Sequence, residues 1–222
     1  MRELTLGRLL EPALRRDPSG PLLTWYDEAG DERVELSAST LDNWVAKTAN
    51  LLDEELPGSP GVVGVRLPAH WQGLVVVLAA WRAGCSVVLG GPAGPECDVL
   101  VVGPDEVALA ADAPAGIALA LRPLNGRLPS PTPPGVLDYA AEVLGHGDAY
   151  AGAGSMEPAI PLDGLTPGDR ALLAIGRDDL AALVDTAVGV YAAGGSLVVC
   201  LDADAATVDR RAAAERATRA LR

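Results

Sequence analysis

The chain has 222 residues, of which 30 are acidic and 17 basic, so its formal charge at pH 7 is −13. A chain of this length can bury a core large enough to fold without disulfides or a structural metal. The negative charge argues against nucleic acid and anionic membrane surfaces as partners, because both would repel it. The longest apolar run, residues 74–81, is far shorter than the roughly 20 residues that span a bilayer.

Cysteine usage and the N-terminal residues indicate a reducing compartment. Cys85, Cys97 and Cys200 are an odd set without the paired spacing of a zinc site or a redox motif. The apolar surroundings of Cys85 and Cys200 predict buried structural thiols. Residues 1–18 alternate charge with leucine and lack the apolar segment of a secretory signal. We therefore expect a cytoplasmic protein.

The first elements in chain order are a helix, a hairpin and a second helix. Leucines at helical spacing predict a helix over residues 6–14, with Thr5 as its N-cap and Pro12 kinking or shortening it. Residues 22–26 and 33–36 flank an acidic turn and predict a β-hairpin. The apolar stripe of residues 40–56 predicts a helix, with Ser39 available as its cap.

The lysine and the acidic residues of this region are interpreted as surface residues without a catalytic role. Lys47, the only lysine of the chain, lies among polar neighbours of the second helix and is interpreted as a solvated surface residue. Asp27, Glu28, Asp31 and Glu32 crowd the hairpin turn, where solubility explains them better than catalysis.

Residues 61–91 form the most diagnostic stretch. A β-branched run ends at Pro68, an apolar helix covers residues 71–83, and Gly84 supplies its left-handed C-cap before a strand at 86–89. This is the pattern of a parallel strand-helix-strand crossover.

The alternation of strand and helix continues to the end of the chain. Strands are predicted at residues 98–102, 117–121, 170–175 and 196–201, and helices at 104–111, 136–144, 178–193 and from about 205. Asp178 and Asp179 are expected to cap the third of these helices, and arginines in the last helix complement its dipole.

The fold class expected from this pattern is α/β, with a mostly parallel sheet flanked by helices. Residues 1–222 are expected to form a single domain. In it a loop-rich connection at about 122–168, with five prolines between residues 123 and 134, separates a larger front part (1–121) from a smaller back part (169–222).

Sequence motifs for phosphate binding, metal binding and nucleophilic catalysis are absent. His70 lies at a strand-to-helix turn, where ligands of open α/β sheets bind, and is the best single candidate for a polar contact, beside its reading as an ordinary helix-start residue. Gly90, Gly91 and Gly94 follow a strand and are further candidates for cofactor binding, although a plain turn explains them better, because the prolines among them remove donors that a phosphate would use. Residues 152–155, Gly-Ala-Gly-Ser, can wrap an anion, but no lysine accompanies them.

Three pieces of the chain resemble the front part of the adenylate-forming (AMP-binding) superfamily of acyl-CoA synthetases, peptide-synthetase adenylation domains and luciferases. They are the opening elements with the hairpin around Thr24-Trp25-Tyr26, the stretch from Gly61 through Leu67-Pro68 to the helix that ends at Gly84, and residues 167–199. Together they cover about two thirds of the chain. His70 falls near the asparagine that usually follows the Leu-Pro of the family.

The resemblance implies ATP-dependent carboxylate activation, which depends on a Ser/Thr/Gly-rich phosphate loop ending in Pro-Lys-Gly, on Mg²⁺ and on a late lysine. Residues 149–163, where that loop is expected, contain no lysine, and Lys47 maps to an early helix. The C-terminal lid of the family has no counterpart. The resemblance therefore predicts a truncated relative that matches the N-terminal part only, with no catalytic residue, metal site or cofactor.

We expect a non-catalytic binding or interaction protein. Two alternatives are a small-molecule binder that takes an acyl group, an adenine nucleotide or CoA, and a partial ligase that needs a partner chain. Loss of the second subdomain predicts exposed apolar surface, which a homodimer or an unidentified protein partner would cover.

Overall fold

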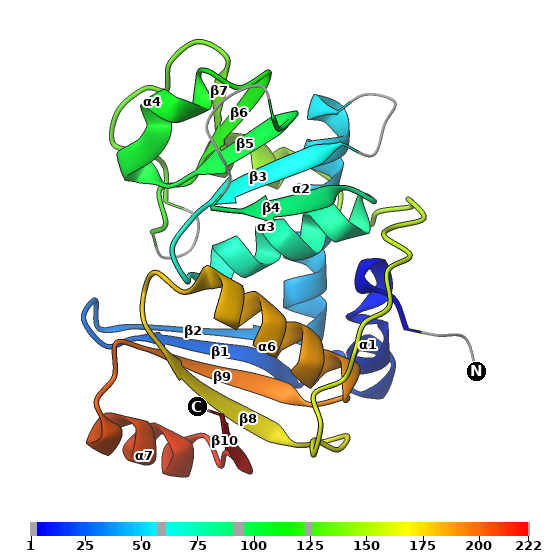
Figure 1. Cartoon of the computed structure of the whole chain (residues 1–222), viewed down its shortest axis with the longest axis vertical. Helices are drawn as coiled ribbons and strands as arrows, with labels where there is room; N and C mark the ends of the chain where they lie inside the picture. The colour runs from blue at the N-terminus through cyan, green and yellow to red at the C-terminus, as the bar shows by residue number, and fades with distance from the viewer. Residues whose placement is uncertain (1–3, 57–60, 91–95, 123–125, 222) are drawn as a thin grey trace.

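The computed structural model describes residues 4–56, 61–90, 96–122 and 126–221. Its strands form two five-stranded sheets, which lie one above the other in Figure 1 with helices between them. The expected α/β class, mostly parallel and flanked by helices, is confirmed. Among the described helices, none is long and apolar enough to cross a membrane.

The first sheet has the order β10-β8-β9-β1-β2. Its strands β1 (Pro21–Asp27) and β2 (Glu32–Ser37) form the expected antiparallel hairpin. All other pairs are parallel, joining β1 to β9 (Ser196–Leu201), β9 to β8 (Arg170–Ile175) and β8 to β10 (Arg219–Leu221). Strands from the beginning and the end of the chain therefore share one sheet.

The second sheet is parallel throughout, in the order β4-β3-β5-β6-β7. It consists of β3 (Val62–Arg66), β4 (Ser86–Leu89), β5 (Val99–Val102), β6 (Ala115–Ala118) and β7 (Val136–Asp138). The expected crossover is confirmed, since β3, α3 and β4 follow one another and β3 pairs with β4 in parallel. Because β4 lies on one side of β3 and β5 on the other, the strand order reverses direction beside β3.

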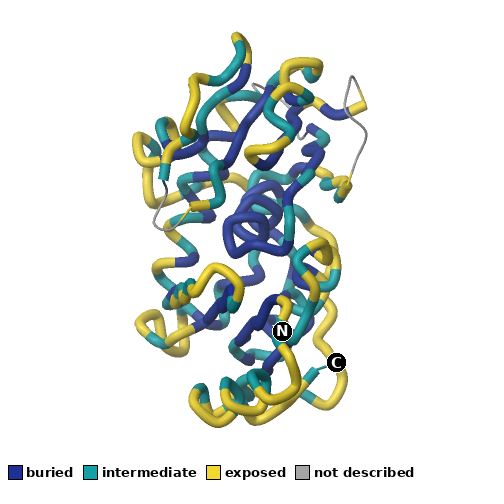
Figure 2. The backbone as a smooth tube through the Cα atoms, turned by 90° about the vertical axis from the view of Figure 1, so that its left-hand side faces the viewer, coloured by how far each residue is buried: buried dark blue, intermediate teal, exposed yellow. Residues whose placement is uncertain are grey.

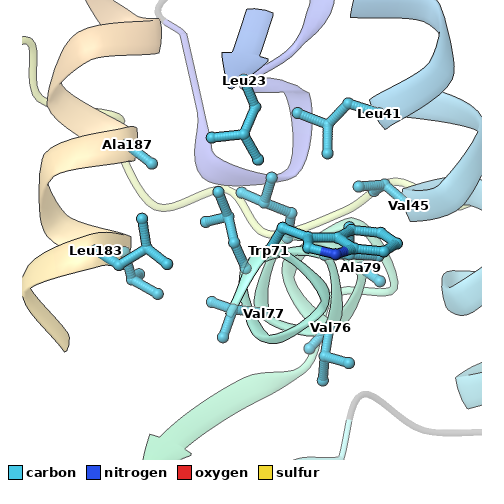
Figure 3. Close-up of a cluster of buried hydrophobic side chains, with 14 of the residues drawn as sticks. Leu23, Leu41, Val45, Trp71, Val76, Val77, Ala79, Leu183 and Ala187 are labelled. Atoms are coloured by element: carbon cyan, nitrogen blue, oxygen red, sulfur yellow. The ribbon is translucent and has the colours of Figure 1, made fainter. Parts of the chain in front are cut away.

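Helix α3 (Trp71–Arg82) lies between the two sheets, and every residue from Trp71 to Ala80 is buried (Figure 1, Figure 2). A helix that is apolar on all sides is stable only where protein surrounds it. Helices α2 (Ala38–Glu55) and α6 (Leu180–Ala192) flank it. Figure 3 shows α3 residues Trp71, Val76, Val77 and Ala79 among Leu23 of β1, Leu41 and Val45 of α2, and Leu183 and Ala187 of α6.

Two further helices cover the outer faces of the sheets. Val208 and Ala212 of α7 (Ala205–Ala214) pack against the buried cluster of Tyr26, Leu172, Val198 and Cys200 on the first sheet. On the second sheet, α4 (Val107–Ala110) follows the short η2 (Pro104–Glu106) and packs on β5 and β6. Each sheet therefore has helices on both faces.

Glycines end the two helices that were expected to stop at them. Gly84 after α3 and Gly194 after α6 have φ of 85° and 81°, the left-handed conformation that glycine adopts without steric cost. The chain can then turn directly into β4 and β9.

The helix starts differ from the expectation in two places. The hydroxyl of Ser37, not Ser39, accepts a hydrogen bond from the Thr40 amide and caps α2, because β2 ends at Ser37. The first helix divides into η1 (Leu6–Arg8) and α1 (Glu11–Arg16), with Pro12 in the first turn of α1. The side chain of Thr5 makes no capping hydrogen bond.

Residues 136–144 were expected to be one helix, and this expectation is wrong. Val136 to Asp138 form β7, and only then come α5 (Tyr139–Glu142) and η3 (Val143–Gly145). The edge of β6 pairs with this segment, so sheet hydrogen bonds outweigh its helical pattern. Asp138 ends the strand and caps α5 by accepting a hydrogen bond from the Ala140 amide.

The described part of the proline-rich connection is irregular and mostly exposed, as expected for residues 126–135. Residues 150–168 then run past the N-terminal segment and α6. The amide of Ala159 donates to the carbonyl of Leu4, and the amide of Leu162 donates to the carbonyl of Gly189. These hydrogen bonds attach the connection to the N-terminal segment and to α6.

Glu215, directly after α7, fastens this helix to the first sheet. Its carboxylate accepts hydrogen bonds from Tyr26 at 2.5 Å, from Arg170 at 2.5 Å and from Arg33 at 3.1 Å. The side chain is only 10% exposed. Burial alone would raise the pKa of Glu215, but these hydrogen bonds outweigh it and lower the pKa to about 2.

We expect Glu215→Gln to lower the free energy of unfolding at pH 7 by about 3 kcal/mol, because Arg170 then loses its buried partner. The stabilisation from Glu215 is complete above pH 4.5, its unfolded value, and is lost as the pH falls toward 2. The difference between the two proteins should therefore shrink over that range. Urea unfolding at several pH values, monitored by tryptophan fluorescence, measures the free energy of unfolding of both proteins. The exposed Glu142→Gln is the matched control, and equal loss in both variants would contradict the assignment.

Candidate functional site

A cleft of about 740 Å³ opens at the carboxyl edge of the second sheet, on the side that faces the start of α6. Its wall begins at Val65, Arg66 and Leu67 of β3 and the turn that follows it, and continues through the residues after β4 and β5. These strands are the ones beside which the strand order reverses, which is where open α/β sheets bind ligands. The volume lies within the usual range of small-molecule sites, about 300–1,000 Å³.

The inner surface of the cleft is apolar. Leu67, Leu89, Leu121 and Leu180 line it, and Leu67 and Leu180 are buried. Leu121 has a φ of 51°, a left-handed conformation that costs a residue with a Cβ about 1–3 kcal/mol. Strain of this kind persists only where the surrounding structure holds the residue in place, and it often marks binding sites.

Arg66, at the end of β3, pairs with Glu106 across the mouth of β5. Its Nε donates to Oε2 at 2.9 Å and its Nη2 to Oε1 at 2.6 Å, the two-pronged geometry that suits guanidinium and carboxylate. Arg66 holds the pKa of the Glu106 carboxyl below its ordinary value. This arginine is therefore engaged by a carboxylate of the chain itself.

Arg177 connects the cleft to the first sheet. Its Nη2 donates to Asp27 Oδ1 at 2.6 Å, and its Nε lies 3.4 Å from Asp202 Oδ2. Its backbone amide donates to Asp202 Oδ1, and its carbonyl accepts from the amide of Ala69. The guanidinium holds the pKa of the Asp27 carboxyl below its ordinary value. One residue thus joins the carboxyl ends of β1, β8 and β9 to the turn after β3.

The N-terminus of α6 forms another part of the wall. Asp179 caps this helix as expected, its Oδ1 accepting from the Ala182 amide at 3.0 Å. Asp178 and Asp105 also line the cleft; both are exposed, and neither has a hydrogen-bond or ion-pair partner among the described residues. The lining of the cleft therefore includes four carboxylates (Asp105, Glu106, Asp178, Asp179) and two guanidiniums (Arg66, Arg177), which gives it a formal charge of −2.

His70 is buried and does not line this cleft. Its Nδ1 accepts a hydrogen bond from the Gln72 amide at 3.2 Å and caps α3, and its ring packs against Trp25 and Trp71. Burial lowers the pKa of His70 to about 3. The structure gives this histidine the role of a helix-start residue, and a contact with a cofactor stays a prediction.

Of the three candidate glycines, only Gly90 lies among the described residues. Gly90 lines the cleft after β4 with a φ of 63° and no atom near its Cβ position. Gly91 and Gly94 lie outside the described residues. The turn after β3 and the end of β4 therefore line the cleft together with side chains from other elements, and a binding role for Gly90 stays a prediction.

The other residues singled out in the sequence lie elsewhere. Lys47 is only 20% exposed, because its Nζ donates to the His146 carbonyl at 2.6 Å and pairs with Asp148 at 2.7 Å, so it was wrongly interpreted as a solvated residue. Gly152 and Ala153 border a separate hollow near Arg8 and Arg82, two arginines paired with Glu11 and Asp42.

The acidic turn and the cysteines are structural. Asp27 and Glu28 were attributed to solubility, but they pair with Arg177 and Arg211. All three cysteines are buried, and burial raises the pKa of Cys200 to about 11. Among the described residues, no three His, Cys, Asp or Glu side chains gather closely enough to hold a metal ion.

Sequence reasoning did not identify Arg66, Gly103, Glu106, Leu121 or Arg177 as parts of a site. Arg66 and Gly103 each stand directly after the apolar core of a parallel strand, which is a usable signal once the strand order is known. The pairing of Arg66 with Glu106 and of Arg177 with Asp27 joins residues far apart in the chain, and no sequence spacing indicates it.

Comparison with known proteins identifies the family. No family model matches the chain. A TIGR03089 family protein of Mycobacterium tuberculosis is 39% identical to it over 241 aligned residues, which cover 97% of either chain. The chain belongs to the TIGR03089 family.

Solved structures show the fold of this TIGR03089 protein. An acetoacetyl-CoA synthetase from Streptomyces lividans superposes with a TM-score of 0.67 at 20% identity, over 96% of this chain and 41% of the synthetase. An acyl-CoA synthetase from Brucella canis gives 0.71 at 15% identity, over 98% and 47%. The ATP-bound RpMatB-BxBclM chimera gives 0.66 at 17%, over 97% and 49%. The resemblance to the adenylate-forming superfamily is confirmed for the fold, and the TIGR03089 chain spans less than half of each of these structures.

We expect His70→Asn to flatten the pH dependence of stability between pH 7.5 and pH 5. The folded protein keeps His70 neutral while the unfolded chain takes up a proton near pH 6.5, so stability falls by about 1.4 kcal/mol per pH unit below that value. Asparagine can cap the helix but does not titrate in this range. Denaturant unfolding at several pH values measures the slope. His146→Asn is the control, and an unchanged slope in His70→Asn would contradict the prediction.

Proposed function

We propose that this TIGR03089 protein is a non-catalytic binding protein, which holds a small molecule in the cleft at the carboxyl edge of the second sheet. The observation that supports it is the cleft itself: 740 Å³ at the point where the strand order reverses, with an apolar interior. A strained residue, Leu121, belongs to the same wall.

The composition of the cleft favours binding over carboxylate activation. Acceleration of phosphoryl chemistry requires positive groups aimed at the developing charge. The two guanidiniums of the cleft are each held by carboxylates of this chain, and its formal charge is negative. Residues 149–163 contain no lysine, and Lys47 is paired with Asp148 in a different part of the molecule.

A second candidate function is a partial adenylate-forming ligase that works together with another chain. It is favoured by the length of the solved synthetases, of which this chain matches 41% to 49%. The two candidates differ in one measurable respect, since a ligase exchanges pyrophosphate into ATP and a binding protein does not.

We expect no ATP–pyrophosphate exchange above background when the isolated chain is incubated with Mg²⁺ and a panel of carboxylic acids. An active acyl-CoA synthetase in the same assay is the positive control. Clear exchange by the isolated chain would contradict the proposal. Exchange that appears only after a second chain is added would replace it by the partial ligase.

The expected homodimer is the second part of the proposal. Three exposed apolar side chains lie in the connection of residues 150–168, namely Met156 (66% exposed), Ile160 (74%) and Leu162 (38%). A surface of this kind is stabilised when a second copy covers it.

We expect light scattering to give the mass of a dimer at micromolar concentration, and Ile160→Asp to give the mass of a monomer, because the carboxylate would be buried without a partner. Leu144→Asp, at another exposed leucine outside that segment, is the matched control. A wild-type protein that stays monomeric at high micromolar concentration would contradict the dimer.

A further inference from the structure

The charge distribution of the cleft selects the ligand that fits it. Three positive features border the cleft and can attract an anion: Arg66, Arg177 and the N-terminus of the 13-residue helix α6. Each one already has a carboxylate of the chain as its partner.

Arg66 shares both prongs of its guanidinium with Glu106. Arg177, which also lines the cleft, is held between Asp27 and Asp202 at the ends of β1 and β9. In the first turn of α6, the Ala182 amide already donates to the Asp179 carboxylate, and the negative charge of Asp179 offsets the positive end of the helix dipole. A phosphate or carboxylate that entered the cleft would have to displace one of these partners.

Two carboxylates of the cleft are in the opposite situation. Asp105, in the segment after β5, and Asp178, just before α6, have no hydrogen-bond or ion-pair partner among the residues that the structure describes. They come from different layers of the molecule and border the same volume. The apolar side chains of Leu67, Leu121 and Leu180 line the same cleft.

We propose that the cleft binds an amphipathic ligand with an apolar body and a cationic head group. This rests on the proposed function and specifies its ligand class. The apolar body lies against the leucines, where its transfer from water is favourable. The cationic head lies near Asp105 and Asp178, which attract it without the loss of any existing ion pair. The same charges disfavour nucleotides and fatty acids.

Three probes with the same eight-carbon chain test the ligand class: octylammonium, octanol and octanoate. Their dissociation constants are measured by isothermal titration calorimetry at low ionic strength, with saturation-transfer NMR for binding weaker than millimolar. We expect octylammonium to bind most tightly and octanoate most weakly. Raising the salt concentration should weaken octylammonium and leave octanol unchanged.

Gly103→Leu tests whether binding occurs in the cleft. Gly103 lines the cleft with φ of −79°, and a Cβ there would meet only Leu121 at 3.7 Å and Leu67 at 4.0 Å. A leucine side chain at this position therefore fills part of the cleft without backbone strain. This variant should weaken octylammonium and octanol by about tenfold or more. Gly145→Leu, at an exposed glycine with an open Cβ position, is the matched control for folding and for added apolar surface.

Asp178→Asn and Asp105→Asn test the head group. Each should weaken octylammonium about two- to fivefold, the value of an exposed ion pair, and leave octanol unchanged. Asp163→Asn removes the same charge from an exposed residue that does not line the cleft, and should leave all three constants unchanged.

Three outcomes would overturn the inference, and they can be told apart. If octanol or octanoate binds as tightly as octylammonium and Gly103→Leu abolishes that binding, the ligand class is wrong and the proposed function stands. If no probe binds in a way that depends on Gly103→Leu, both the ligand class and the binding function of the cleft are wrong. Equal effects of Asp163→Asn and Asp178→Asn would show attraction to the overall charge of −13 only.

Discussion

The structure depends on the burial of α3 between two sheets. Ten consecutive residues of this helix are buried, so neither sheet can form its inner face without it. A helix in that position must be apolar around its whole circumference, and its ends must turn sharply, which the His70 cap and the left-handed Gly84 allow. The crossover is therefore both a supersecondary unit and the centre of the core, to which α2, α6 and β1 each add one side (Figure 3).

This central helix also explains where the cleft lies. Helix α3 separates the two sheets, and at their carboxyl ends the turn after β3 contacts the turn after β8. The contact between Ala69 and Arg177 fixes that approach, and Arg177 in turn holds the ends of β1 and β9. The cleft is therefore a consequence of the layer arrangement, and Arg177, whose carbonyl accepts the hydrogen bond from Ala69, is part of its wall.

Much of the fold could be predicted from the sequence because its signals are local. The hairpin, the crossover, the cap at Asp179 and the stop at Gly194 follow from hydrophobic period, cap chemistry and glycine position. Residues 136–144 show the limit, since pairing with β6 overrides the helical pattern of residues 136–138 and makes them the edge strand β7. Of the residues that line the candidate cleft, the sequence predicted only Gly90 and the neighbourhood of the turn after β3. His70 stands out in the sequence because an imidazole can bind ligands and transfer protons. The cleft instead depends on pairs such as Arg66 with Glu106, which come together only when the sheet has formed.

The first sheet joins the beginning of the chain to its end, since Leu23 of β1 pairs with Leu197 of β9. Closing a loop of that length costs conformational entropy before the new contacts can offset it, so such distant pairings form late in folding. During synthesis, the hairpin of β1 and β2 leaves the ribosome long before its neighbours β8 and β9 exist. Its apolar face and the edge of β1 must wait, unpaired, until almost the whole chain has been made, so this protein is exposed to aggregation chiefly while it is being translated.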